Sequence, residues 1–208
     1  FRSHWPMNRP IFETLWDDGG NYTFPTSATA MDIVSSSTSD TMQVKVSGLD
    51  ANYNEVSETL TLNGTTSVSG TTAFLRINSA IILTGSNVGN ITISSGGLTY
   101  AYIGATLGTT QSSVYTVPAG YSLYLTRIDV CSGTNNGQKY LTFRNVVTTS
   151  AGRTLRVAEA TFSTSQVSFD RQVPFKIGEK SDFHFEAKSS SSENEVSIFI
   201  EAILVKDD

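Results

Sequence analysis

The sequence is poor in the residues that most enzymes use. It contains one cysteine, Cys131, and two histidines, His4 and His184. One cysteine excludes a disulfide within these residues, and Cys131 is expected to be a small apolar residue at the end of a strand. Ser-His-acid and Cys-His catalysis need a histidine beside the nucleophile, and neither histidine lies in a recognisable motif. His184 falls on the polar side of an alternating segment, which favours a surface histidine over a general base.

The motifs of common catalytic and metal sites are also missing. There is no G-x-S-x-G, no Walker sequence, no H-E-x-x-H and no C-x-x-C. "WDDGGN" offers carboxylates to calcium without the spacing of an EF-hand, so a turn is the better interpretation. Glycoside hydrolysis needs two carboxylates across a cleft, and the candidate pairs all lie in or beside turns: Asp17/Asp18, Glu55/Glu58 and Glu193/Glu195. We expect no enzymatic activity, no cofactor and no metal, with a β-sandwich glycoside hydrolase as a remote alternative.

Charge is sparse and its balance is acidic. Only 16% of the residues are charged, against about 25% in an ordinary soluble domain. The formal net charge is −5 and the pI is about 5.0. A nucleic-acid binder needs a basic face to neutralise phosphates, and a membrane span needs about 18 consecutive apolar residues. We therefore expect neither a nucleic-acid nor a membrane partner.

Hydrophobic alternation is what the sequence has in abundance. In "TMQVKVSG", Val44 and Val46 alternate with polar residues, and in "ETLTLNG" Leu60 and Leu62 do the same. This period of two is typical of half-buried strands. The segment between them, "GLDANYNEV", is rich in Gly, Asp and Asn, which favour turns. These features together predict a β-hairpin.

The same pattern continues along the chain. The dipeptides Asn63-Gly64 and Asn136-Gly137 favour positive φ angles and predict tight hairpin turns. Further strands are expected at residues 73–84, 88–94, 98–104, 121–131, 138–147, 153–162, 166–177, 182–188 and 194–205. Strands at this spacing, with no long amphipathic helix, are typical of a sandwich or barrel. We predict an all-β antiparallel sandwich with jelly-roll-like character.

Two short segments suggest an internal repeat. "YTFP" at 22–25 and "YTVP" at 115–118 each precede a strand, a turn rich in Ser, Thr and Asn, and another alternating strand. A match this short can also arise by coincidence. If it is real, it describes two pseudo-duplicated halves at about 22–111 and 112–208, because a solenoid repeat would have a shorter period.

The first 21 residues differ from the rest. They lack strand alternation, and their prolines discourage regular pairing. They are nevertheless too apolar for a free tail, so we expect an extended arm that docks either on its own sandwich or on a neighbour and can be removed without loss of the β fold. The apolar residues of this arm are Trp5, Ile11, Phe12, Leu15 and Trp16.

The last strand is apolar on both faces. In "EVSIFIEAILV", one face includes Ile198 and Ile200, and the other includes Phe199, Ile203 and Val205. A strand covered on both sides lies in the middle of a sandwich or against another subunit. By contrast, "DFHFEAK" predicts a strand with one solvent-exposed face.

Arginine often lies at subunit contacts, and six arginines fall within the predicted strands: Arg76, Arg127, Arg144, Arg153, Arg156 and Arg171.

Several segments in order resemble a recurrent virion structural protein of tailed bacteriophages. They are "WDDGGNYTFP", "VSGLDANYNEVSETLTLNGTT", "FLRINSA", "YTVPAGYSLYLTRIDV" and a double-faced apolar strand ending "EAILVKDD". The resemblance covers the chain from about Trp16 to its end. It depends on the combination, because each segment alone is ordinary for β-hairpins.

The resemblance implies a non-enzymatic head decoration or cement protein on the exterior of the phage particle. Such a protein binds itself, with a trimer favoured, and binds the major capsid protein. Many weak bridging contacts then stabilise the shell through avidity. An alternative is a tail, fibre or baseplate component that binds host glycans, in which case Tyr53, Tyr100 or Tyr102 would line a shallow groove.

Overall fold

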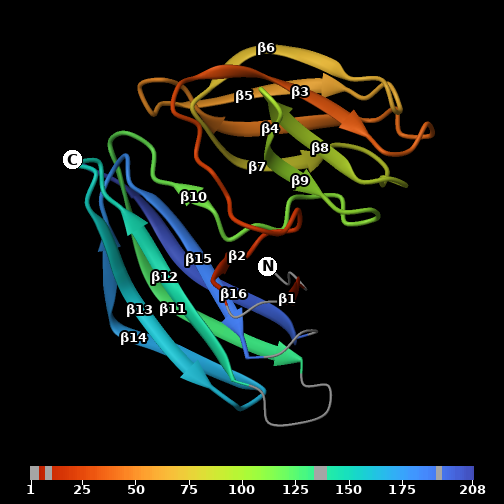
Figure 1. Ribbon diagram of the computed structural model, residues 1–208. Helices are drawn as coiled ribbons and strands as arrows, with labels where there is room; N and C mark the ends of the chain where they lie inside the picture. The colour runs from red at the N-terminus through yellow and green to blue at the C-terminus, as the bar shows by residue number, and fades with distance from the viewer. Residues whose placement is uncertain (1–4, 8–10, 134–139, 191–193) are drawn as a thin grey trace. The chain divides into compact units, whose positions relative to one another are not determined.

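The computed structural model describes residues 5–7, 11–133, 140–190 and 194–208 of the chain. Every regular element in these residues is a β-strand. The predicted all-β antiparallel sandwich class is therefore confirmed (Figure 1). None of the described residues form a helix able to span a membrane. The chain divides into two compact units: a middle unit, Thr23–Gln111, and a terminal unit, Phe1–Tyr22 with Ser112–Asp208.

The terminal unit contains two antiparallel sheets. The first has the order β1 (Trp5–Met7), β16 (Asn194–Lys206), β11 (Tyr121–Gly133), β14 (Gln166–Ile177). The second has the order β10 (Tyr115–Thr116), β15 (Asp182–Ser189), β12 (Leu141–Thr148), β13 (Thr154–Phe162), and β2 (Glu13–Thr14) also pairs with β15. Alternate residues of the central strands fill one apolar core, which includes Leu125, Ile128, Phe143, Phe185 and Ile198.

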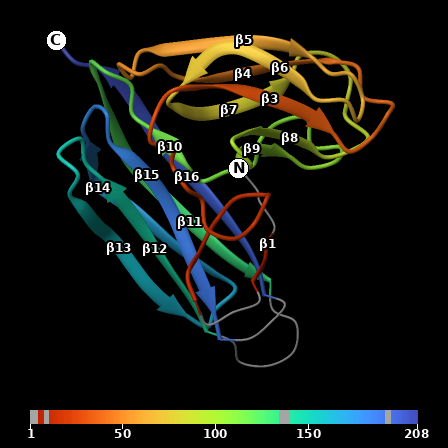
Figure 2. The same ribbon diagram turned by 45° about the horizontal axis from the view of Figure 1, so that its top comes forward.

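The middle unit also contains two antiparallel sheets. One has the order β6 (Val68–Phe74), β3 (Thr29–Ser35), β8 (Ile91–Ser95), β9 (Leu98–Ile103). The other has the order β5 (Glu55–Thr61), β4 (Gln43–Leu49), β7 (Arg76–Ile82). Figure 2 shows these strands in the red-to-green part of the chain. The fully buried apolar side chains of the middle unit include Met31, Ile33, Val44, Phe74 and Ile93.

The two units share one strand connectivity. In the middle unit β3 pairs with β6 and β8, while β4 pairs with β5 and β7. In the terminal unit β11 pairs with β14 and β16, while β12 pairs with β13 and β15. Strands β3 to β8 therefore correspond in order to β11 to β16, and "YTFP" and "YTVP" precede corresponding strands. The internal duplication stays a prediction with which this connectivity agrees. The jelly-roll detail also stays a prediction, because the repeated pattern has fewer strands than a full jelly roll.

Most predicted strands lie within a few residues of the observed ones, but the range 73–84 does not. It spans the end of β6 and all of β7, which belong to different sheets. The chain breaks at Leu75, whose backbone amide donates to the carbonyl oxygen of Leu49. Phe74, Leu75, Arg76 and Ile77 are all buried, so the alternation of side chains is interrupted where the chain crosses from one sheet to the other. The short strands β1, β2 and β10 were not predicted.

The hairpin at "GLDANYNEV" is confirmed, since β4 and β5 pair from Gln43 opposite Thr61 to Leu49 opposite Glu55. The Asp50 side chain organises the connection. Its Oδ1 accepts the backbone amides of Asn52 and Asn54 at 2.8 and 2.9 Å. These bonds let the chain reverse at Tyr53, where φ is +66°.

The two predicted Asn-Gly hairpins need correction. Asn63 and Thr66 do form a tight turn, with the Thr66 amide donating to Asn63, but this turn leads from β5 to β6, which lie in different sheets. Asn136-Gly137 lies outside the described residues, and the strands on either side of it, β11 and β12, also belong to different sheets. A turn dipeptide fixes a local reversal and does not decide which strand becomes the partner.

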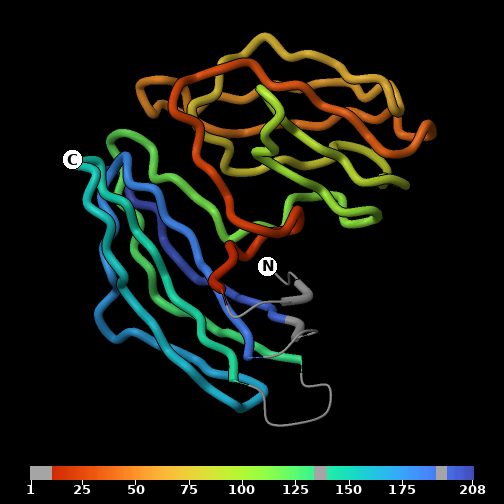
Figure 3. The backbone as a smooth tube through the Cα atoms, viewed as in Figure 1, coloured from red at the N-terminus to blue at the C-terminus, as the bar shows by residue number. Residues whose placement is uncertain are grey.

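The predicted arm of residues 1–21 is in part a component of the terminal unit. Leu15 has no exposed surface and Trp16 is 5% exposed, and both belong to the core of that unit. The trace in Figure 3 shows the segment from residue 11 onward as the first coloured part of the chain. The expectation that all 21 residues can be removed without loss of the fold is therefore wrong, because removal would empty core positions.

Candidate interaction surface

Strand β16 carries three exposed apolar side chains on one face. Phe199, Ile203 and Val205 are 43%, 58% and 43% exposed. We call these three residues the β16 stripe. They are at alternate positions with Glu201 between them, so they lie on the face of the sheet that points away from the core. On the opposite face Val196 and Ile198 are buried, which fixes the orientation of the strand.

Polar and aromatic groups of neighbouring strands border the stripe. Tyr124 of β11 lies directly opposite Ile203, and the Nζ atom of Lys176 is 6.0 Å from the centroid of its ring. Val205 lies opposite Ser122. The stripe therefore has an aromatic ring and a cation beside it, in addition to its own apolar groups.

An ion-pair cluster lies between the ends of the stripe. Arg127 of β11 is opposite Glu201, and its Nε is 2.9 Å from Asp129 Oδ2 and 3.4 Å from Asp170 Oδ1. The hydrogen bond with Asp129, followed by the charges of Asp129 and Asp170, raises the pKa of Arg127. Charged groups of β11 and β14 therefore lie beside the apolar side chains of the stripe.

The other predicted interface residues have different surroundings. Ile11 is 49% exposed, whereas Leu15 and Trp16 belong to the chain's own core and are not available to a partner. Phe12 is half-buried, and its ring lies 3.8 Å from Arg144 Cζ and 4.7 Å from Lys188 Nζ. The side chain of Trp5 lies outside the described part of the structure. Among the predicted interface residues whose side chains the structure describes, the stripe and Ile11 are the exposed ones.

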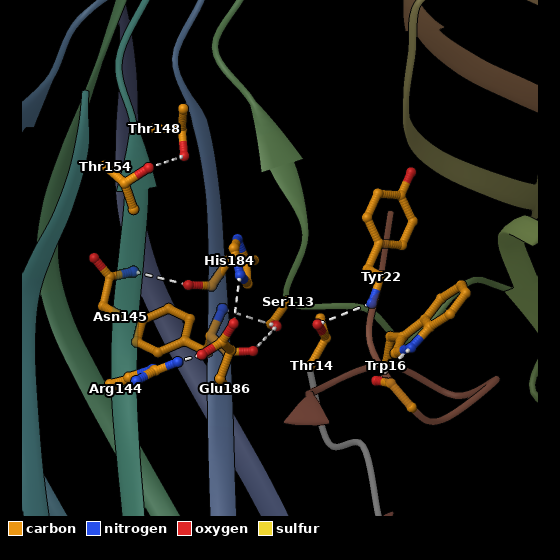
Figure 4. A network of polar contacts seen from close by, with 12 residues as sticks. Thr14, Trp16, Tyr22, Ser113, Arg144, Asn145, Thr148, Thr154, His184 and Glu186 are labelled. Carbon is orange, nitrogen blue, oxygen red and sulfur yellow. Dashed lines mark hydrogen bonds and ion pairs between the residues drawn. The ribbon is translucent and has the colours of Figure 1, made fainter. Parts of the chain in front are cut away.

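A polar network on β12 and β15 is the second candidate site (Figure 4). Arg144 Nε donates to Glu186 Oε2 at 2.5 Å, and His184 Nε2 lies 3.1 Å from Glu186 Oε1. The hydrogen bond with His184 lowers the pKa of Glu186, burial opposes this effect, and Arg144 adds to it. The side chains of His184 and Glu186 are 14% and 16% exposed. The face of β15 that was predicted to be exposed to solvent is therefore largely buried.

The network has a structural explanation, because it adjoins the attachment of residues 11–22. Leu15 N donates to the carbonyl of Phe185, while Ser113 Oγ accepts the amide of Phe185 at 3.2 Å. Figure 4 shows Thr14 and Tyr22 on the same segment, joined by a 3.0 Å hydrogen bond from Tyr22 N to Thr14 Oγ1. Ser113 Oγ is thus hydrogen-bonded to the backbone of Phe185, whose carbonyl oxygen also accepts from it at 3.3 Å.

The residues of the alternative functions lie in other environments. Glu58 accepts the backbone amides of Thr71 and Thr72 at 2.8 and 3.1 Å, so it connects β5 to β6, and Glu193 lies outside the described residues. Of the three tyrosines proposed to line a glycan groove, Tyr100 is only 8% exposed. Arg76, one of the strand arginines, is also buried, where it donates to the carbonyl of Pro25 at 2.7 Å.

The exposure of β16 differs from the expectation that both of its faces are covered. The apolar residues on both faces suggested that the strand is covered on both sides, but only one face is covered and only at one end. The sequence feature that indicates this exposure is in the second half of β16, where Ala202, Ile203, Leu204 and Val205 follow each other without a polar residue. All four are exposed.

Comparison with known proteins does not assign the chain to a family. A scan against protein-family models gave no match, and a search of curated proteins gave none either.

Proposed function

We propose that the chain is a structural component of a phage particle, a decoration or cement protein that binds the exterior of the head. The observation that carries this proposal is the β16 stripe. Three large apolar side chains on one regular strand cost free energy in water. Because each is about half exposed, a partner that buries the exposed part gains about 1 kcal/mol for each side chain. Exposed apolar side chains gathered on one strand are a candidate protein contact.

The duplicated sandwich architecture is consistent with such a role. Two units with the same connectivity provide repeated surfaces on one chain. When one protein occupies many equivalent sites on a shell, each contact can be modest, because linked binding events raise the overall avidity. The sparse charge of the sequence leaves hydroxyl groups and apolar side chains to make these contacts.

Rebinding to depleted particles tests the proposal. Particles of the phage that encodes this chain, prepared without it, are mixed with purified protein, and bound copies are counted by quantitative gel or mass spectrometry. We expect saturable binding of hundreds of copies for a head protein, as opposed to a few to a few dozen for the tail, fibre or baseplate alternative. Absence of any saturable binding would contradict the proposal.

A matched pair of variants connects the binding to the stripe. Ile203→Ser with Val205→Ser removes two exposed apolar groups of β16, and we expect at least a tenfold loss of particle affinity. Val173→Ser removes an apolar side chain that is 81% exposed on β14 and is expected to leave binding unchanged. Equal affinity of all three proteins would show that the stripe is not the contact.

A further inference from the structure

Residues 11–14, which we call the latch, lie along β15 in the terminal unit. Strand β2 pairs with β15 so that Thr14 is opposite Glu186. Ala187 belongs to the core, so the neighbouring Glu186 points to the outer face of the sheet. Since paired residues share a face and alternate residues return to it, Phe12 lies on this outer face as well.

Two cations of the outer face hold the ring of Phe12. Arg144 Cζ lies 3.8 Å from the centroid of the ring, and Lys188 Nζ lies 4.7 Å from it. Both distances are within the range of a cation–π interaction. Phe12 is half-buried. The attachment of the latch therefore depends on where these two cations are held.

Glu186 sets the position of Arg144. Arg144 Nε donates to Glu186 Oε2 at 2.5 Å, and the two side chains are 18% and 16% exposed. The other carboxylate oxygen of Glu186 lies 3.1 Å from His184 Nε2. Figure 4 shows the three side chains joined by these contacts. One carboxylate therefore orients the guanidinium group on which the ring of Phe12 packs.

Charged residues of β13 and β2 complete the surroundings. Glu159 of β13 lies opposite Arg144 and is exposed. Arg156 of β13 lies in the same row of the sheet as His184. Glu13 of β2 pairs with a core residue and points to the other face of the sheet. Arg144 thus has a half-buried carboxylate on one side and an exposed carboxylate on the other.

Protonation of Glu186 removes the charge that holds Arg144. The hydrogen bond with His184 lowers the pKa of Glu186 below its ordinary value of 4.5, burial opposes this effect, and the hydrogen bond with Arg144 adds to it. A carboxyl group with a lowered folded-state pKa stabilises the fold at pH values above its unfolded-state pKa. This stabilisation is lost as the pH falls through the folded-state pKa. The contribution of Glu186 is therefore complete at neutral pH and absent in strong acid.

We propose that the latch opens in acid: a protonated Glu186 releases Arg144, and residues 11–14 then leave β15. The other attachments of the latch are short, because β2 has two residues and Ile11 is 49% exposed. The residues that follow are buried in the core and stay in place. Release exposes the ring of Phe12 and frees the edge of β15 beside it. The latch belongs to the terminal unit and does not depend on the proposed function.

Nuclear magnetic resonance of the ¹⁵N-labelled chain follows the latch during a pH titration. The Nε–H signal of Arg144 reports its pair with Glu186, the backbone amide of Phe12 reports the latch, and the indole signal of Trp16 reports the core. As the pH falls from 7 to 3, we expect the Arg144 and Phe12 signals to change together while the Trp16 signal stays. A Phe12 amide that is unchanged after Arg144 has moved, or a Trp16 signal lost at the same pH, overturns the proposal.

Glu186→Gln and Glu159→Gln are a matched pair of variants at pH 7. Each removes one carboxylate beside Arg144 and keeps the size of the side chain. In Glu186→Gln we expect the amide of Phe12 to exchange its hydrogen about tenfold faster than in the wild type, as for the loss of one partly desolvated cation–π contact. Its pH dependence should also disappear, which a merely structural role of Glu186 would not produce. Glu159→Gln should match the wild type, and equal exchange in the two variants would exclude Glu186 as the positioning residue.

Phe12→Leu separates the ring from the charges. The variant removes the cation–π contacts and keeps the pair of Arg144 with Glu186. We expect its latch amides to exchange fast at every pH, while the Arg144 Nε–H signal at pH 7 still shows the ion pair. If the latch of Phe12→Leu stays as protected as in the wild type, the ring does not connect the latch to Arg144 and the mechanism fails.

Discussion

The carboxylate of Asp40 accepts the backbone amide of Gly89 at 2.9 Å, although the two residues are 49 positions apart. The same carboxylate accepts the amide of Val88 at 2.8 Å and the hydroxyl of Ser35 at 2.5 Å. Asp40 has no exposed surface. One side chain therefore joins the connection between β3 and β4 to the connection between β7 and β8 within the middle unit.

We predict that Asp40→Ala destabilises the middle unit. The substitution leaves two backbone amides without their acceptor, and hydrogen bonds to a charged group contribute about 1.5–3 kcal/mol each. Urea unfolding should show a loss of about 3–6 kcal/mol in the free energy of unfolding. Asp18→Ala, at an exposed turn position, is the control. A loss no larger than that of the control would show that the carboxylate is dispensable.

The lowered pKa of Asp40 also predicts a loss of stability at acidic pH. Burial is the largest effect on its pKa and raises it, but the hydrogen bonds from Ser35, Val88 and Gly89 together outweigh burial, so its pKa is lowered from 3.8. A carboxyl group whose pKa is lower in the folded state than in the unfolded state stabilises the fold at pH values above its unfolded-state pKa. This stabilisation is lost as the pH falls through the folded-state pKa. We expect the wild type to lose more stability than Asp40→Asn when pH is lowered from 5 to 3. Parallel pH profiles of the two proteins would contradict this explanation.

Close packing around Gly48 leaves no room for a side chain at this position in the middle unit. A Cβ atom at this position would lie 2.0 Å from the backbone oxygen of Arg76 and 3.0 Å from Phe74 Cδ1. Gly48→Ala must therefore shift the backbone of β4 or β7, at a cost of about 1–3 kcal/mol. Gly178→Ala meets no atom within 4 Å and is the matched control. Thermal unfolding of the two variants measures the difference, and equal midpoints would refute the close approach.

Trp16 predicts that the N-terminal segment stabilises the terminal unit. Its side chain is 5% exposed in the core, and its ring lies 5.1 Å from the ring of Tyr22 in an edge-on arrangement. Trp16→Ala should reduce the free energy of unfolding by about 3–5 kcal/mol. Ile11→Ala, at a residue 49% exposed, should change it little. If both variants unfold like the wild type, residues 11–22 do not contribute to the core.

The strands of this fold could be predicted from the sequence because burial on one face leaves a period of two. Val44 and Val46, for example, are both buried as their alternation indicates. The partners of each strand could not be predicted, because pairing is set by contacts far apart in sequence. Asn63-Gly64 marks a turn correctly and still leads from one sheet to another.

The candidate surface was only partly predictable for the same reason. The apolar pattern of β16 correctly drew attention to Phe199, Ile203 and Val205, but it could not show whether a strand of the same chain covers them. Leu15 and Trp16 have the same apolar character and lie in the core. Hydrophobicity identifies residues that need to be buried, and only the arrangement of strands shows which of them remain without cover.

A cryo-electron microscopy map of the assembled particle, at a resolution that separates strands, tests the central claim most directly. The claim is that β16 is an attachment surface of a virion protein. We predict that Phe199, Ile203 and Val205 are covered by a neighbouring subunit in the copies on the particle. A map in which these side chains face solvent in every copy, or in which the particle contains no density for this chain, would contradict the account.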